Sequence, residues 1–386
     1  MARRGAAEIA LSSEDALRLH VLITQAEAIR IDENQLEVYG LKGEQVMQLT
    51  LHPTSRSDIY LEKVRELLAQ QVLNTPGGYP VVLRRWGRMG QVESSQLEKL
   101  LCLGDVDAVM AVVSAPGLTL ELARRAWWAA PYSEYARQML ANPKVRQSEL
   151  GREMALYLVE HLPFESEHNT IMETVRLLLQ PGLVSEEQRL RLWSSGRSKI
   201  SYRIPFLERS ARFGDPLPIK AKAKEGGAAL KSLLQPQLEQ GESLTTLLVH
   251  LQGEAGQAFI QGVLDALRRP PDQEVVTALF NAIGSYFAQE GERQAASLEE
   301  IQTVVEAKLQ HPGEGLAALL HSAPQIRQEI EAILFLGQIH ESLLTPIFVR
   351  SDAVGTLMRK KIAPVVAPLQ QKLKLLQGYP QEPMGA

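Results

Sequence analysis

Histidine and cysteine are the residue types here that could bind a metal or act as nucleophiles, and their spacing favours neither role. The chain has eight histidines and one cysteine, Cys102. No two histidines stand four residues apart, the spacing that puts two imidazoles on one helical face for zinc. His161 and His168 flank Glu165 and Glu167, which suggests either a carboxylate–imidazole metal site or, the interpretation we favour, a solvated acidic loop. We therefore expect no metal and no cofactor.

Common catalytic motifs are missing as well. The pair Gly77-Gly78 lacks the following Lys-Ser/Thr of a phosphate-binding loop, and the sequence contains no Gly-x-Gly-x-x-Gly and no Gly-x-Ser-x-Gly. A site joining Asp32, His52 and Arg84 is conceivable, but nothing in their spacing asks for it. The sequence predicts that this chain is not an enzyme.

Cys102 has two interpretations. It lies among Leu100, Leu101 and Leu103, which indicates a buried structural thiol. The alternative is a sulfur-relay role in which Cys102 carries a persulfide. That role needs an exposed thiol with a lowered pKa, and Lys99 is the one nearby cation that could provide it.

Arginine combined with tryptophan is the pattern that most resembles a binding surface. Arg84, Arg85, Trp86 and Arg88 form one such group, and a second occurs in the segment 121–128, which reads ELARRAWW. Residues 176–224 hold 11 Lys/Arg and 4 Asp/Glu, a balance of 11 − 4 = +7 in a chain of net charge −4. Five cations of this segment are candidate partner-binding residues: Arg189, Arg191, Arg197, Lys199 and Arg203.

These groups also have two interpretations. Arginines next to aromatic rings could bind an acidic protein face or single-stranded RNA, whose bases stack on such rings. Alternatively, the tryptophans are core residues and the arginines form a solvated helix face. The partner-binding interpretation requires the arginines to be exposed on one face and not paired with carboxylates inside the chain.

The pattern of apolar residues predicts a mostly α-helical protein with a small N-terminal α+β module. Ser12-Ser13-Glu14-Asp15 is typical of a helix start, and alternating apolar residues between Ile29 and Leu51 predict three strands. A helix from Asp58 and a strand over Tyr79–Trp86 complete the module.

The predicted domains are a disordered tail (1–11), the α+β module (12–91), a helical repeat region (92–209), a linker or long loop (210–227), a C-terminal helical region (228–379) and a disordered tail (380–386). In the C-terminal region we predict helices over 228–253, 255–268, 272–289, 297–310, 314–321, 323–345 and 352–377.

An internal repeat supports the helical region. Residues 116–128 and 181–193 align without gaps and share Pro, Gly, Leu, Glu, Arg and Trp at the same offsets, including Trp128 and Trp193. A period of 65 residues leaves room for two helical hairpins. We therefore expect a HEAT-like α-solenoid, with Trp128 and Trp193 in the same slot between helices.

The composition points to a cytoplasmic protein. A single cysteine cannot form an intramolecular disulfide, which fits a reducing compartment. The N-terminal segment lacks the apolar run of a secretory signal, and no segment approaches the roughly 20 apolar residues that span a membrane. We expect no membrane insertion.

Several segments resemble the DsrS-type accessory proteins, which are encoded among the dissimilatory sulfite reductase genes of sulfur-oxidising bacteria. The similarity covers residues 11–210 and lies in the segments LSSEDALRLHVL (11–22), AIRIDENQLEVYGL (28–41), GGYPVVLRRWGRMGQ (77–91), APGLTLELARRAWWA (115–129), YLVEHLPFE (157–165) and VRLLLQPGL (175–183). The resemblance implies an accessory or regulatory role in cytoplasmic sulfur oxidation and implies no active-site residues. We expect a protein partner from the sulfur-oxidation system, with RNA as a further possibility.

Overall fold

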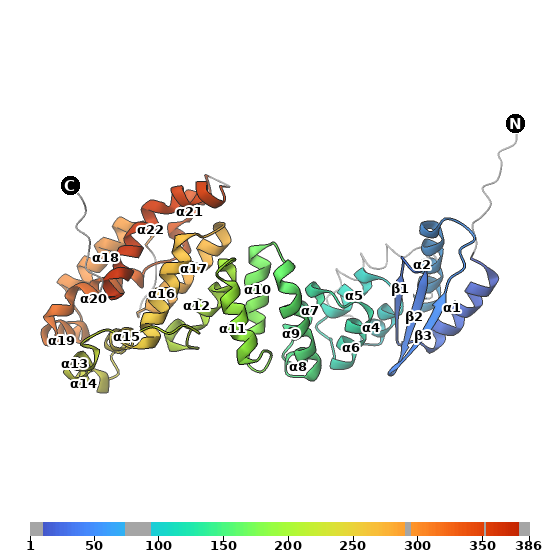
Figure 1. Ribbon diagram of the computed structural model, residues 1–386, viewed down its shortest axis with the longest axis horizontal. Helices are drawn as coiled ribbons and strands as arrows, with labels where there is room; N and C mark the ends of the chain where they lie inside the picture. The colour runs from blue at the N-terminus through green and yellow to red at the C-terminus, as the bar shows by residue number, and fades with distance from the viewer. Residues whose placement is uncertain (1–10, 74–93, 290–294, 351–352, 378–386) are drawn as a thin grey trace. The chain divides into compact units, whose positions relative to one another are not determined.

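The computed structural model describes residues 11–73, 94–289, 295–350 and 353–377 (Figure 1). These residues form two compact units. Unit 1 extends to His161 and includes Pro181–Leu183, whereas unit 2 comprises Leu162–Gln180 and the chain from Val184 onward. The predicted helical region 92–209 is therefore shared between the two units.

Unit 1 begins with the predicted α+β module. Helix α1 (Ser13–Gln25) is capped by Ser12, whose Oγ accepts a hydrogen bond from the Asp15 amide at 3.1 Å. Three antiparallel strands follow in the order β1 (Ala28–Asp32), β2 (Glu37–Lys42) and β3 (Gln45–Thr50), and helix α2 (Ser57–Leu73) completes the described part of the module.

The buried core of this module draws residues from the sheet and from both helices. Val38 pairs with Leu49 in the β2–β3 register, and both are buried together with Leu19 of α1 and Val64 of α2. The fold of mostly α structure after an N-terminal α+β module is confirmed. The predicted strand Tyr79–Trp86 and the predicted tails 1–11 and 380–386 lie outside the described residues, except for Leu11, which is partly buried against the core.

From residue 94 onward, the described part of unit 1 is helical. Its helices are α4 (Ser94–Leu101), α5 (Val106–Val113), α6 (Leu120–Ala129), α7 (Ser133–Leu140), α8 (Pro143–Arg146) and α9 (Glu149–His161). Helices that are neighbours in sequence pack against each other, as in the pairs α4–α5, α5–α6 and α6–α7. This is the local packing that an α-helical repeat requires.

Unit 2 is also helical in the part of the chain that the structure describes. Its α-helices of six or more described residues are α10 (His168–Leu178), α11 (Glu186–Ser195), α12 (Ile204–Arg209), α13 (Gly227–Leu233), α15 (Ser243–Gln252), α16 (Glu254–Arg268), α17 (Gln273–Phe287), α18 (Leu298–Gln310), α19 (Glu314–Ser322), α20 (Arg327–Leu336) and α22 (Gly355–Gln377). The predicted linker contains a single turn of 3-10 helix, Ala211–Phe213, and no α-helix before α13.

Two of the predicted C-terminal helices are wrong. The range 228–253 is divided into α13 (Gly227–Leu233), α14 (Gln235–Glu239) and α15, because Pro236 starts a new helix and Gly241 has a positive φ of 74°. The predicted helix 323–345 is also divided, because α20 ends at Leu336 and α21 (Thr345–Phe348) is a separate helix. Between them, Gly337 packs so closely that an added Cβ would lie 2.6 Å from the Phe287 carbonyl oxygen. The described helices include none that is both long and apolar enough to cross a membrane.

Helices α6 and α11 start 66 residues apart, one residue more than the predicted period of 65. Helix α6 begins after the cap Thr119 and α11 after the cap Ser185, which are 66 residues apart. Trp127 and Trp193 consequently occupy the same position, the eighth of their helices, and are 7% and 5% exposed. Trp128 is only half-buried. The expectation that Trp128 and Trp193 fill equivalent slots is wrong, because the gap-free alignment ignores the shift in the cap.

Candidate partner-binding surfaces

The first group of predicted site residues, Arg84, Arg85, Trp86 and Arg88, lies outside the described residues. Its role in binding stays a prediction. The other predicted site residues, Arg189, Arg191, Arg197, Lys199 and Arg203, belong to residues 176–224 and are described.

Most cations of residues 176–224 are paired within the chain. Arg176 donates two hydrogen bonds to the Glu208 carboxylate, at 2.7 and 2.8 Å, and Glu208 raises the pKa of this guanidinium. Arg191 pairs with Glu187 at 2.6 Å, and Lys224 with Glu329 at 3.4 Å. These pairs neutralise much of the positive charge that the sequence places in this segment.

Asp215 forms ion pairs with two further arginines. It accepts from Arg209 Nε at 2.7 Å and lies 3.9 Å from Arg189, which also donates to the Pro216 carbonyl at 3.1 Å. Lys199 points inward too, since its Nζ donates to the backbone carbonyl of Glu165 at 2.6 Å.

Arg203 is a packing residue. Its guanidinium lies 4.8 Å from the centroid of the buried Trp193 ring and 3.8 Å from Asp265. Burial lowers the pKa of Arg203, and the nearby Asp265 acts in the opposite direction. A side chain held between an indole and a carboxylate is not presented to a partner.

Among the five named candidates, Arg197 alone is exposed without an ion pair or hydrogen bond from its side chain to another described residue. Lys220 and Lys222 of the same segment are exposed in the same way. The structure thus leaves a few separate cations where the sequence suggested a continuous basic surface.

Cys102 has the geometry of a structural thiol. It is half-buried, its Sγ donates to the Ala26 carbonyl at 3.5 Å, and burial raises its pKa to about 11. Such a thiol is protonated at neutral pH and is a poor nucleophile. This geometry disfavours the persulfide-carrier role, which needs a thiolate.

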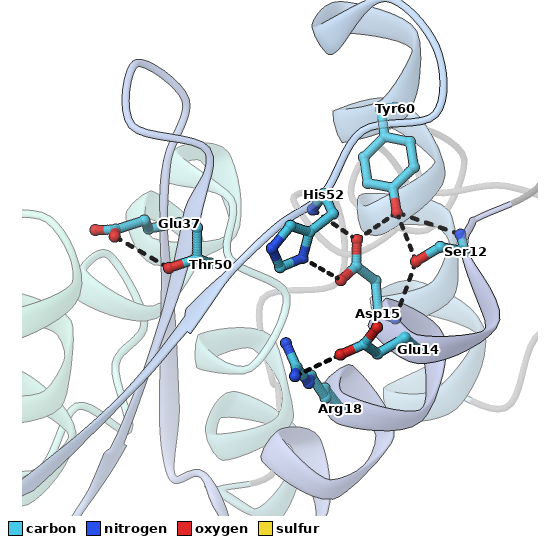
Figure 2. Close-up of polar contacts among 8 residues, drawn as sticks. All are labelled: Ser12, Glu14, Asp15, Arg18, Glu37, Thr50, His52 and Tyr60. Atoms are coloured by element: carbon cyan, nitrogen blue, oxygen red, sulfur yellow. Dashed lines mark hydrogen bonds and ion pairs between the residues drawn. The ribbon is translucent and has the colours of Figure 1, made fainter.

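Asp32 and His52, two of the three residues considered for an enzyme site, have separate partners. Asp32 accepts hydrogen bonds from the Asn34 and Gln35 amides in the β1–β2 turn. His52 instead approaches Asp15, as Figure 2 shows, with Nδ1 at 3.5 Å and its backbone amide donating at 2.9 Å. Arg84 lies outside the described residues. Among the described residues, no three His, Cys, Asp or Glu side chains are grouped to hold a metal ion.

The second arginine–tryptophan motif does form a concave surface, in unit 1. A pocket of about 360 Å³ lies between α6 and the start of α9 and is lined by Arg124, Trp127, Trp128, Pro131, Glu149, Leu150 and Glu153. Trp127 forms its inner wall, because its Nε1 donates to Glu153 at 2.8 Å and its ring packs edge-on against Tyr157.

Trp128 forms the outer wall of this pocket, which we call the tryptophan pocket. The Arg30 guanidinium lies 5.2 Å from the centroid of the Trp128 ring and 5.0 Å from that of Tyr39, so strand β1 supports the indole. The sequence identified the two tryptophans and Arg124, but it gave no signal for Pro131, Glu149 and Glu153. These residues join the pocket only because α9 packs beside α6 and α7 in the folded unit.

Unit 2 has a larger, more polar pocket of about 480 Å³, lined among others by Arg176, Glu208, Asn281 and Phe348. Three of its polar side chains, Arg176, Glu208 and Asn281, already have partners inside the chain. Arg176 is held by Glu208, and Asn281 exchanges two hydrogen bonds with Glu341, at 2.7 and 3.2 Å. We prefer the tryptophan pocket as the candidate for a partner, because its lining is more apolar and includes the half-buried Trp128 ring.

Comparison with known proteins provides no relative for this chain: no family model, no curated protein and no solved structure matches it.

Proposed function

We propose that this chain is a non-catalytic accessory or regulatory protein of cytoplasmic dissimilatory sulfur oxidation and that it acts by binding a protein of that system. The resemblance of residues 11–210 to DsrS-type proteins supplies the biological setting. The tryptophan pocket is the observation that carries the binding role, because tryptophan and arginine are enriched among the residues that dominate protein–protein binding energy.

The ion pairs of residues 176–224 favour a protein partner over RNA. Affinity for RNA depends on cations that are free to replace the counterions of phosphate. Arg176, Arg191 and Arg209 are instead engaged by Glu208, Glu187 and Asp215. A protein partner needs fewer free cations and can use the apolar walls of the tryptophan pocket.

The proposal is tested by affinity purification of the tagged chain from cells that are oxidising stored sulfur, with co-purifying proteins and RNA both identified. We expect proteins of sulfur oxidation to be enriched and to be lost with Trp128→Ala. A second variant, Glu149→Lys, changes a carboxylate on the pocket rim whose side chain is 86% exposed, and it removes only the surface ion pair with Arg152.

Leu156→Ala is the matched control, since Leu156 is 48% exposed on α9 but does not line the pocket. Retention of the partners by both pocket variants would reject the tryptophan pocket as their binding site. Enrichment of RNA without protein would reject the proposed function.

A further inference from the structure

Helix α22 carries an unusual charge. Over its 23 residues it has five cations, Arg359, Lys360, Lys361, Lys372 and Lys374, and no carboxylate. The chain as a whole has a net charge of −4, so this helix differs strongly from its surroundings. Lys372 is paired with Glu331 at 2.6 Å, which leaves the first half of the helix as the more basic part.

The fold brings a second basic segment to this first half. The Gly355 amide donates to the Pro271 carbonyl at 2.8 Å, and Arg359 Nη1 donates to the Pro270 carbonyl at 3.3 Å. Arg268 and Arg269 directly precede these prolines and are exposed. Two basic segments some 90 residues apart in sequence, 268–269 and 359–360, therefore meet at one place on unit 2.

Within the described residues, carboxylates pair with one of the three cations of this cluster, which are Arg268, Arg269 and Lys360. Asp265 is the one carboxylate that forms an ion pair with it, 3.9 Å from Arg268, and it is shared with Arg203 at 3.8 Å. Arg269 and Lys360 have no ion pair to a described residue. Unlike the arginines of residues 176–224, these cations are free to meet an anionic group.

Exposed aliphatic side chains lie beside the cations. Val354 is 65% and Leu357 is 58% exposed. Leu357 and Lys360 are three residues apart on α22 and so share one face of the helix. Val354 immediately precedes Gly355, whose amide holds the 270–271 segment.

We propose that these five residues (Arg268, Arg269, Val354, Leu357 and Lys360), the basic–apolar patch, bind an acidic segment of a partner protein that also carries apolar side chains. Carboxylates of such a segment would meet the cations, and its apolar side chains would cover Val354 and Leu357. RNA fits less well, since the patch has no aromatic ring on which a base could stack. An anionic membrane would require a larger apolar face than two aliphatic side chains.

The test uses the full chain and a fluorescein-labelled peptide of about twelve residues that alternates glutamate and leucine, with fluorescence anisotropy as the readout. We expect binding that weakens with salt and is absent for the same peptide with glutamine in place of glutamate. The double variant Arg269→Glu/Lys360→Glu should weaken binding by at least about tenfold. Leu357→Ser should also weaken it, by about threefold to tenfold.

The matched control is Lys220→Glu/Lys222→Glu, which makes the same change in net charge at two exposed lysines outside the patch. We expect it to leave peptide binding within about twofold, because steering by distant charges is screened at physiological salt. An equal loss in both double variants would overturn the proposal, as would full binding by Arg269→Glu/Lys360→Glu.

Two other ligands test whether the patch binds RNA or a membrane in place of a protein. Tighter binding of poly(U) or of phosphatidylserine vesicles than of the peptide, unaffected by Leu357→Ser, would overturn the protein assignment. The inference rests on the proposed function that this chain binds a protein. If proteins of sulfur oxidation co-purify equally with the Arg269→Glu/Lys360→Glu variant, the patch is wrong and the proposed function stands.

Discussion

Tyr60 donates its hydroxyl hydrogen to Asp15 Oδ2 at 2.5 Å, and both residues are fully buried (Figure 2). The same carboxylate accepts the backbone amide of His52, at 2.9 Å. Asp15 therefore connects the first turn of α1 to the chain after β3 and to α2. In the sequence Asp15 is only an acid in a helix start, whereas in the structure it is the centre of a buried polar network.

Tyr60→Phe should destabilise unit 1 by about 1–3 kcal/mol, because a buried carboxylate loses one of its hydrogen-bond donors. The measurement is urea denaturation followed by circular dichroism. Tyr132→Phe is the control, since Tyr132 is 51% exposed and its hydroxyl has no hydrogen bond to a described residue. Equal stability of the two variants would show that the Tyr60 hydroxyl contributes little.

The Asp15 network should also make stability depend on pH on the acid side. Burial raises the pKa of Asp15, but the hydrogen bonds from Tyr60 and His52 outweigh burial, and its folded pKa is below the ordinary value. A carboxyl with a lowered folded pKa stabilises the protein above its unfolded pKa of about 3.9 and loses this contribution as pH falls through the folded value.

We therefore expect the difference in unfolding free energy between the natural chain and Asp15→Asn to be constant from about pH 7 to pH 5 and to shrink below about pH 4. Denaturation curves at a series of pH values measure it. A difference that grows as pH falls would mean that the folded pKa of Asp15 is raised.

The sequence predicted the elements of this network and not their assembly. Ser12 as a helix cap, the three strands and α2 follow from local patterns, since capping and alternation are properties of neighbouring residues. The meeting of Asp15, His52 and Tyr60 depends on how α1 and α2 pack on the sheet. The spacing of residues along the sequence does not reveal packing of this kind.

The difference between local pattern and packing also explains why the sequence did not reveal the ion pairs of the arginines. Counting charges along residues 176–224 gave a basic segment, but Arg203 is held by Asp265 and Lys224 by Glu329, both from outside that segment. Net charge per segment therefore exaggerated the exposed positive charge. The basic–apolar patch was missed for the converse reason, because it forms only when residues 268–269 and 354–360 are brought together.

Cys102 should react slowly with iodoacetamide in the folded protein. With a pKa of about 11, its thiolate fraction at pH 7.5 is roughly 300 times smaller than that of a free cysteine. The reaction rate should still rise about tenfold per pH unit between pH 8 and pH 9, where a free cysteine begins to level off. Mass spectrometry of the alkylated chain measures this rate. A plateau below pH 9 would indicate an activated thiol and return attention to the sulfur-relay role.

The shifted repeat predicts which tryptophans stabilise the fold. Trp127 and Trp193 are buried at the eighth position of their helices, so Trp127→Phe and Trp193→Phe should each cost about 1–3 kcal/mol. Trp127→Phe additionally leaves Glu153 without the indole donor. Trp128→Phe should cost less than about 1 kcal/mol, because Trp128 is half-buried and a phenyl ring can still lie beside Arg30.

Urea denaturation of the three variants decides between the two alignments. If Trp128→Phe and Trp193→Phe cost the same and Trp127→Phe costs little, the gap-free 65-residue alignment describes the packing, and the 66-residue correspondence set by Thr119 and Ser185 is wrong. The expected order instead pairs Trp127 with Trp193. It would also show that Trp128→Phe can be used beside Trp128→Ala to test the tryptophan pocket without a large loss of stability.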